Sequence, residues 1–289
     1  KIQYKEISSY HQQECKKWAE RLSSRKVLLG EEENAYARIQ AQLKKWEGTA
    51  GWNSGKDEVM AIQKVLEQCK EYDEKLARKE ISGYFDKTVK ECNLRLEAQK
   101  KRIEQEEELY EPIQKLQALH AKTKYSDLAS EKNALARLIE RCVLYLNRSG
   151  QKEIATYYRK FVQGWHEKGV EQKKRLDEEE ALHAEIVRSY AAWEKRKWDD
   201  AKSELDHLTN LVALCTTYKN KTLVFEISNY HNKTVFGYLD KLEARKKFIE
   251  GEESLFLGIK KQREKIHGES YTNLSDQQKD IQSFLGLYA

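Results

Sequence analysis

The chain of 289 residues contains one proline and 13 glycines, and 35% of its residues are Asp, Glu, Lys or Arg. So few helix-breaking and turn-forming residues exclude a turn-rich β protein, while 16 Tyr, 6 Trp and 7 Phe are too many for a disordered charged tail. The chain is therefore expected to fold as an all-α protein, and its formal net charge of +5 does not by itself indicate nucleic-acid binding.

A repeat of 73 or 74 residues runs through the whole chain. The string Glu-Ile-(Ser/Ala)-x-Tyr occurs four times, and other positions recur in register with it. These recurring positions are expected in the helical core: Ile7, Ile81, Ile154 and Ile227; Trp18, Cys92, Trp165 and Tyr238; Cys69, Cys142 and Cys215; Tyr72, Tyr145 and Tyr218. So many aligned positions at one period indicate a tandem array of structural modules.

Clusters of small, polar and charged residues divide each period into helices. Breaks are expected at 48–55, 122–126, 195–200 and 268–275, and weaker ones at 78–80, 147–150 and 219–222. Between the breaks apolar residues recur at intervals of three and four, the spacing of an amphipathic helix. In one full period the three helices are predicted at 103–121, 128–146 and 153–170.

Charged segments place the module boundaries inside continuous helices. In residues 100–108, and in their copy at 173–180, a single apolar residue interrupts a run of charge. A helix that is polar nearly all round can bridge two cores, so the third helix of one module is expected to continue into the first helix of the next. In chain order the predicted parts are a third helix at 1–26, modules at 27–99, 100–172 and 173–245, and an incomplete module at 246–289.

Three-helix modules joined by an uninterrupted helix resemble the rods of the spectrin and α-actinin family. The string from Trp18 to Leu22 is similar to the tryptophan-anchored strings of those repeats, and residues 56–76 are similar to their middle helix. Cys69 stands where that family usually has a His, and the period is shorter than the family's. The resemblance covers the whole chain and implies an elongated cytoskeletal spacer or crosslinker.

No motif in the sequence indicates catalysis, so the chain is expected not to be an enzyme and to have no catalytic, cofactor-binding or metal-ligating residues. Residues 51–57 have one residue too few between their glycines for a phosphate loop, and Asp57 stands where Ser or Thr should reach the metal. The seven His show no His-Glu-x-x-His spacing. The cysteine series is interpreted as core packing because each member has apolar neighbours on its helical face.

The acidic runs at 31–33, 106–108 and 177–180 are interpreted as solvated helix surface. They lack the loop and the glycine of a calcium site, and the lysines before them have helical spacing for ion pairs. Because carboxylates follow each lysine cluster, nucleic acid is not expected as the primary partner.

Five cysteines, an odd number, fit reduced thiols and predict a cytoplasmic protein. The resemblance to spectrin-type rods implies association with the cytoskeleton. No run of about 18 apolar residues is present, so no membrane span is expected. Four Asn-x-Ser/Thr sequons favour the opposite, secreted context, and that alternative stays open. The sequons begin at Asn147, Asn220, Asn232 and Asn273.

Two hypotheses of function follow from these patterns. The first is a non-enzymatic helical rod that spaces or crosslinks other proteins, with cytoskeletal filaments or further copies of the chain, joined through the incomplete end modules, as partners. The alternative is a tetratricopeptide-like solenoid of helical hairpins that binds a peptide or protein in a concave groove, although the 34-residue period of that family is missing.

Overall fold

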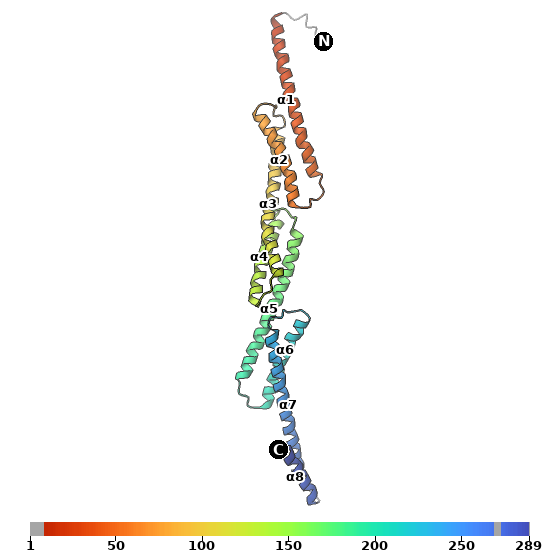
Figure 1. The fold of residues 1–289 in the computed structure, drawn as a ribbon, viewed down its shortest axis with the longest axis vertical. Coiled ribbons are helices and arrows are strands. Elements are labelled where there is room, and N and C mark those ends of the chain that lie inside the picture. The colour runs from red at the N-terminus through yellow and green to blue at the C-terminus, as the bar shows by residue number, and fades with distance from the viewer. Residues whose placement is uncertain (1–8, 269–272, 289) are drawn as a thin grey trace. The chain divides into compact units, whose positions relative to one another are not determined.

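The computed structural model describes residues 9–268 and 273–288, and all regular secondary structure in them is α-helical (Figure 1). The all-α class expected from the composition is confirmed. The helices are α1 Ser9–Glu47, α2 Gly55–Ala77, α3 Asp86–Lys122, α4 Leu128–Gly150, α5 Arg159–Lys195, α6 Ala201–Leu223, α7 Asn232–Gly268 and α8 Leu274–Tyr288.

The helices follow the period of the sequence. Helices α2, α4 and α6 each contain 23 residues, and α3, α5 and α7 each contain 37. The predicted continuity is confirmed, because α3 runs through the charged segment 100–108 and α5 through 173–180 without interruption. The module boundaries at 27, 100, 173 and 246 stay predictions.

The starts of the middle helices are fixed by a recurring capping residue. The Ser54 hydroxyl accepts a hydrogen bond from the amide of Asp57 at 3.2 Å, and the Asp200 carboxylate accepts from the amide of Ser203 at 2.7 Å. Asp127, in register with both, accepts from the amide of Ser130 at 2.7 Å. These caps satisfy amides that the first helical turn leaves without a partner. The three breaks predicted before these helices are confirmed.

The ends of the middle helices also repeat, through a residue with left-handed backbone. Lys79, Lys152 and Phe225 have φ angles of 59°, 58° and 59°. The amide of the residue that follows each of them bonds back to the carbonyl five positions earlier, as from Glu80 to Lys75 at 2.9 Å. This is the bonding of a Schellman motif, which closes a helix and turns the chain away from its axis.

The turns after the middle helices correct several predictions. The weak breaks expected at 147–150 and 219–222 are helical, because α4 continues to Gly150 and α6 to Leu223. A third helix was expected from about position 153, but α5 begins at Arg159, and the weak break at 78–80 is a full turn over 78–85. Each Glu-Ile-(Ser/Ala)-x-Tyr string in the described chain lies in such a turn, not in a helix. The reason is the buried Ile of the string, since Ile81, Ile154 and Ile227 are 4%, 0% and 3% exposed and anchor the turn to the core.

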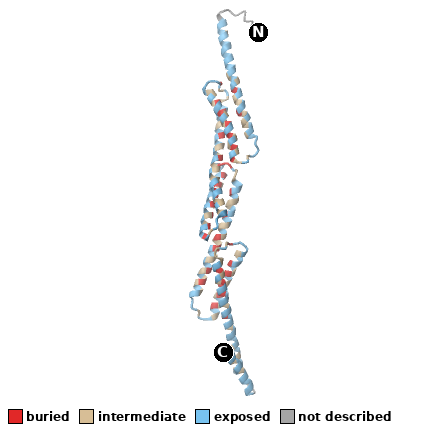
Figure 2. Cartoon of the chain, in the orientation of Figure 1, coloured by how far each residue is buried: buried red, intermediate tan, exposed pale blue. Residues whose placement is uncertain are grey.

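The described residues form two compact units. In the first, which comprises residues up to Thr123 with Arg137–Glu167, one core lies among α1, α2 and α3 around Ile62 and Leu96, and another among α3, α4 and α5 around Ile113 and Tyr145. The second, Lys124–Ala136 with the described residues from Lys168 on, has a core among α5, α6 and α7. Figure 2 shows the buried residues on faces where neighbouring helices meet.

Candidate functional site

The structure buries most of the positions that recur in the sequence. Side chains at most 4% exposed are Ile81, Ile154, Ile227, Cys69, Cys142, Cys215, Tyr72, Tyr145 and Tyr218. Cys92, Trp165 and Tyr238 are half-buried and pack against the cores. Ile7 lies outside the described residues. The core assignment of Trp18 is wrong: its side chain is 58% exposed, because residues 16–27 of α1 are exposed on all sides and no described helix covers that face.

A buried carboxylate stands at the same place in each of the three predicted modules between residues 27 and 245. Glu32, Glu106 and Glu179 are 1%, 0% and 0% exposed. Each accepts a hydrogen bond from a core tyrosine of the middle helix, as Glu179 does from the Tyr218 hydroxyl at 2.7 Å; the other pairs are Glu32 with Tyr72 and Glu106 with Tyr145.

The same carboxylates also hold the turn that leads into the next helix. The backbone amides of Phe85, Tyr158 and His231 donate to Glu32, Glu106 and Glu179 at 2.9, 3.0 and 2.9 Å. Each buried glutamate therefore ties three segments of a predicted module together, because its carboxylate accepts from both the middle helix and the turn. In Glu106 and Glu179 one carboxylate oxygen accepts both of these bonds, and the other oxygen, Oε2, is buried without a hydrogen-bond partner. We call the three buried residues the core glutamates.

Charge is retained at the first core glutamate. Burial alone would raise the pKa of Glu32, but hydrogen bonds from Ser82, Tyr72 and the backbone outweigh it, so the pKa lies below its usual value. Burial and the adjacent carboxylate raise the pKa of the Tyr72 hydroxyl. The tyrosine therefore remains a proton donor to an ionised glutamate at neutral pH.

A stacked ring pair recurs in register with each core glutamate, with one ring four residues after the glutamate and the other on the residue whose amide donates to it. Tyr36 stacks on Phe85 with ring centroids 4.0 Å apart, and Tyr110 stacks on Tyr158 at 3.7 Å. In the second unit the pair is His183 on His231, at 3.6 Å. Burial, and then the facing His231, lower the pKa of His183, so the ring stays neutral over a wider pH range.

A second set of glutamates lies where one predicted module meets the next. Glu58, in the first turn of α2, accepts hydrogen bonds from Trp46 at 3.1 Å, from Gln99 at 3.2 Å and from the Tyr157 hydroxyl. The tyrosine comes from the turn before α5, and its ring packs against the core formed by α1, α2 and α3. Hydrogen bonds between Arg102 and the turn, including the Ala155 amide to the Arg102 carbonyl at 3.2 Å, add to this contact.

Glu131 repeats this arrangement in the second unit. Its carboxylate accepts from Gln172 at 3.1 Å and from the Tyr230 hydroxyl at 2.5 Å. Glu58 and Glu131 are 5% and 8% exposed. We call them the junction glutamates, because each joins the start of one module's middle helix to a turn of the following module.

The third glutamate of this set has a different partner. Glu204 accepts two hydrogen bonds from the Arg245 guanidinium, at 3.0 and 2.9 Å, and one from Trp193 at 3.4 Å. Arg245 stands in register with Gln99 and Gln172. Its guanidinium lowers the pKa of Glu204, so a charge-assisted pair replaces the neutral amide contact of the other two copies.

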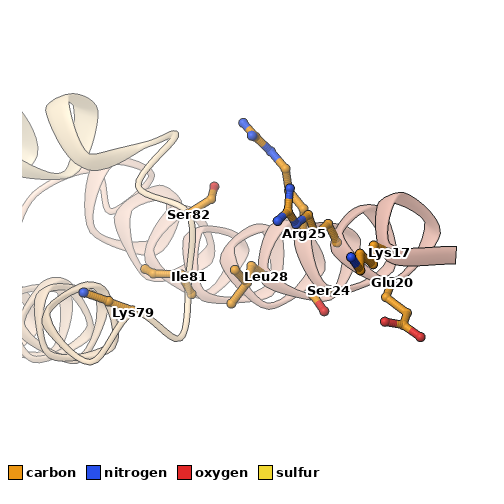
Figure 3. Close-up of a pocket in the computed structure, with 9 residues that line it drawn as sticks. Lys17, Glu20, Ser24, Arg25, Leu28, Lys79, Ile81 and Ser82 are labelled. Carbon is orange, nitrogen blue, oxygen red and sulfur yellow. The ribbon is translucent and has the colours of Figure 1, made fainter. Parts of the chain in front are cut away.

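A positively charged pocket of about 670 Å³ lies in the first unit (Figure 3). Lys17 and Arg25 project from α1, and Lys79 and Ser82 come from the turn after α2. Arg21 adds a fourth cation, and Glu20 is the single carboxylate that lines the pocket. Such a surface fits an anionic group of a binding partner.

The described chain gives no support to metal or membrane sites. In residues 9–268 and 273–288, no three His, Cys, Asp or Glu side chains are grouped so that they could hold a metal ion. Within the same ranges, no helix combines the length and hydropathy that crossing a bilayer requires.

Sequence reasoning missed the buried glutamates. The acidic runs were interpreted as solvated surface, which is wrong for Glu32, Glu106 and Glu179, although their neighbours in the runs are exposed or half-buried. Their fixed distance after each repeated Ile was the signal that could have identified them. Comparison of the chain with protein families, curated proteins and solved structures finds no match.

Proposed function

We propose that the chain is a non-enzymatic structural or scaffolding protein, an elongated array of three-helix modules that spaces or crosslinks partner proteins. The observation that carries this proposal is the pair of junction contacts, Tyr157 with Glu58 and Tyr230 with Glu131. Each joins residues of successive predicted modules, and both recur with the period of the array. A spacer needs such contacts between neighbours, because its stability is the sum of its modules and their interfaces.

Continuous helices support the same proposal. A helix of 37 residues spans about 55 Å and belongs to two predicted modules at once, so bending between them would cost helical hydrogen bonds. The resemblance to spectrin and α-actinin rods agrees with this use of shared helices. It also favours cytoskeletal filaments as partners and a cytoplasmic location. The pocket beside Lys17 and Lys79 would suit an acidic surface on such a partner.

The radius of gyration tests the elongated array. A compact globule of 289 residues should have a radius of about 19 Å. Small-angle X-ray scattering from the monomeric chain is expected to give a clearly larger value. A folded monomer with the compact value would contradict the proposal.

A proline in the shared helix tests the coupling between modules. Lys174→Pro, at a side chain 75% exposed on α5, removes a helical hydrogen bond and is expected to split thermal unfolding into separate transitions. Lys174→Ala is the matched control and should unfold like the parent. Co-sedimentation with actin filaments and with microtubules tests the cytoskeletal part, and failure with both would remove it.

A further inference from the structure

The first module has two neighbouring thiols in its core. Cys69 on α2 is fully buried and Cys92 on α3 is half-buried, and both belong to the same core cluster as free thiols. The two thiols lie close enough together for each to change the pKa of the other. At the position of Cys92 the other two modules have Trp165 and Tyr238, so their buried cysteines have no second thiol at that place.

The smaller side chains of the first module also leave a pocket. In the second unit Tyr190 stacks on Tyr238 with centroids 3.9 Å apart, whereas Leu43 and Cys92 occupy the matching positions in the first. A pocket of about 310 Å³ lies there, and Leu43, Cys92 and Arg95 are among the residues that line it. A molecule as small as a peroxide can therefore reach Cys92, while Cys69 lies in the core behind it.

The two thiols differ in acidity in a way that suits oxidation. The neighbouring Cys69 thiol, helped by the nearby Arg95, lowers the pKa of Cys92 against the opposing effect of burial. The Cys92 thiol and burial raise the pKa of Cys69 far above its usual value. Arg95 is held in place by Glu47 at 2.6 Å. Cys92 is thus the thiolate nucleophile, and Cys69 keeps its proton.

We propose that Cys69 and Cys92 are a redox site that forms a reversible disulfide between α2 and α3 on reaction with hydrogen peroxide. The Cys92 sulfur attacks one peroxide oxygen, the O–O bond breaks, and the leaving hydroxide takes up a proton to become water. The Cys69 sulfur then attacks the sulfenic acid, the S–O bond breaks, and a second water leaves with the Cys69 proton. Two thiols are oxidised and one peroxide is reduced to two waters.

The crosslink would reinforce the first module independently of the spacer function. It closes a loop that contains the whole turn after α2, including Ile81, and so restricts the unfolded chain. Oxidation is expected to raise the thermal midpoint of the first unit, and reduction by a dithiol should reverse the change.

Alkylation of the full chain tests the site. Cys15, which is not buried, is first replaced in a Cys15→Ser background to prevent crosslinks between chains. After treatment with hydrogen peroxide, the chain is denatured, alkylated with N-ethylmaleimide and mapped by mass spectrometry. We expect the free thiols of Cys69 and Cys92 to disappear together, about tenfold faster than the free thiol of Cys142, and dithiothreitol to restore both. Cys142 is the slow reference because burial raises its pKa to about 11.

Two variants give matched controls. Cys92→Ser should keep Cys69 alkylatable, whereas Cys142→Ser should leave the Cys69–Cys92 disulfide unchanged, and circular dichroism checks that each variant folds. The proposal is overturned if Cys92 proceeds to sulfinic acid while Cys69 stays free. Equal rates of loss at all four cysteines would overturn it as well.

Discussion

The hydroxyl of Tyr157 donates a hydrogen bond to the carboxylate of Glu58, 99 residues earlier in the chain. Tyr230 and Glu131 have the same relationship across the same separation. In both cases the glutamate lies in the first turn of a middle helix, where the helix dipole also favours negative charge. One hydroxyl group thus contributes to each contact between predicted modules, and its removal leaves a buried carboxylate short of a donor.

Tyr157→Phe should weaken the first unit. The substitution keeps the ring against the core but removes the hydroxyl from Glu58, which is 5% exposed. We expect the free energy of unfolding to fall by about 1–2 kcal/mol, the cost of an unsatisfied buried acceptor. Urea denaturation followed by circular dichroism measures it.

Tyr84→Phe is the matched control for that variant. Tyr84 occupies the same position of the repeated string but is 78% exposed. Loss of its hydroxyl should leave the unfolding midpoint unchanged. Equal destabilisation by the two substitutions would mean that the Tyr157 hydroxyl has no special role at the junction.

The helices could be predicted because their signals are local. Apolar spacing, the scarcity of proline and capping residues such as Asp200 act within one or two turns, and they placed the breaks before the three middle helices correctly. The start of α5 at Arg159 was missed because Ile154 is apolar in either structure, and its burial in a turn depends on contacts from other helices. Trp18 was misassigned for a related reason, since periodicity shows a face but not what covers it.

The core glutamates were not predicted because their partners are distant. Glu106 lies in a run of charge, and local composition favours a solvated surface there. Its donors are the Tyr145 hydroxyl and the amide of Tyr158, which reach it only after the three helices pack. Only the register of the repeat carries this information in the sequence.

The stacked histidines should make the second unit sensitive to acid. The folded-state pKa of His183 lies below its usual value of 6.5, so the unfolded chain binds the proton more readily. The contribution of neutral His183 to the free energy of unfolding is therefore fully present above about pH 6.5, and it is lost as the pH falls from there through the folded-state pKa. The groups around the pair include Glu179, which accepts the His231 amide, and Tyr218. Urea midpoints at pH 7.5 and 5.5 measure the loss.

The first module supplies the control for the histidine pair. Tyr36 and Phe85 stack at the matching place without a group that titrates near pH 6. The double variant His183→Tyr, His231→Phe should therefore flatten the pH dependence between 7.5 and 5.5. If the stability of this variant still falls between pH 7.5 and 5.5, other titratable groups cause the fall.

Phe225→Gly should stabilise the second unit. Phe225 has a φ of 59° and a side chain 75% exposed, so it bears the strain of left-handed backbone and makes little compensating contact. Glycine adopts that conformation freely, and we expect a gain of about 0.5–1 kcal/mol in the free energy of unfolding. Phe225→Ala removes the same ring but keeps a Cβ, so it should give no such gain. If Phe225→Ala raised the free energy of unfolding more than Phe225→Gly, the effect would come from removal of the exposed ring and not from the backbone conformation.

Arg245→Gln replaces the partner of Glu204 by the residue type that stands in register with it, at Gln99 and Gln172, in the other two copies. Arg245 is 43% exposed, so solvent screens part of its attraction, and we expect the free energy of unfolding at pH 7 to fall by about 1 kcal/mol. The low pKa of Glu204 in the folded chain means that its contribution is present above about pH 4.5 and is lost as pH falls below that value. In the variant this loss should become shallower, which a series of urea midpoints from pH 6 to 3 would measure. Lys247→Gln removes a neighbouring charge on the exposed surface and should change neither quantity. The same effect in both variants would point to net charge and not to the pair with Glu204.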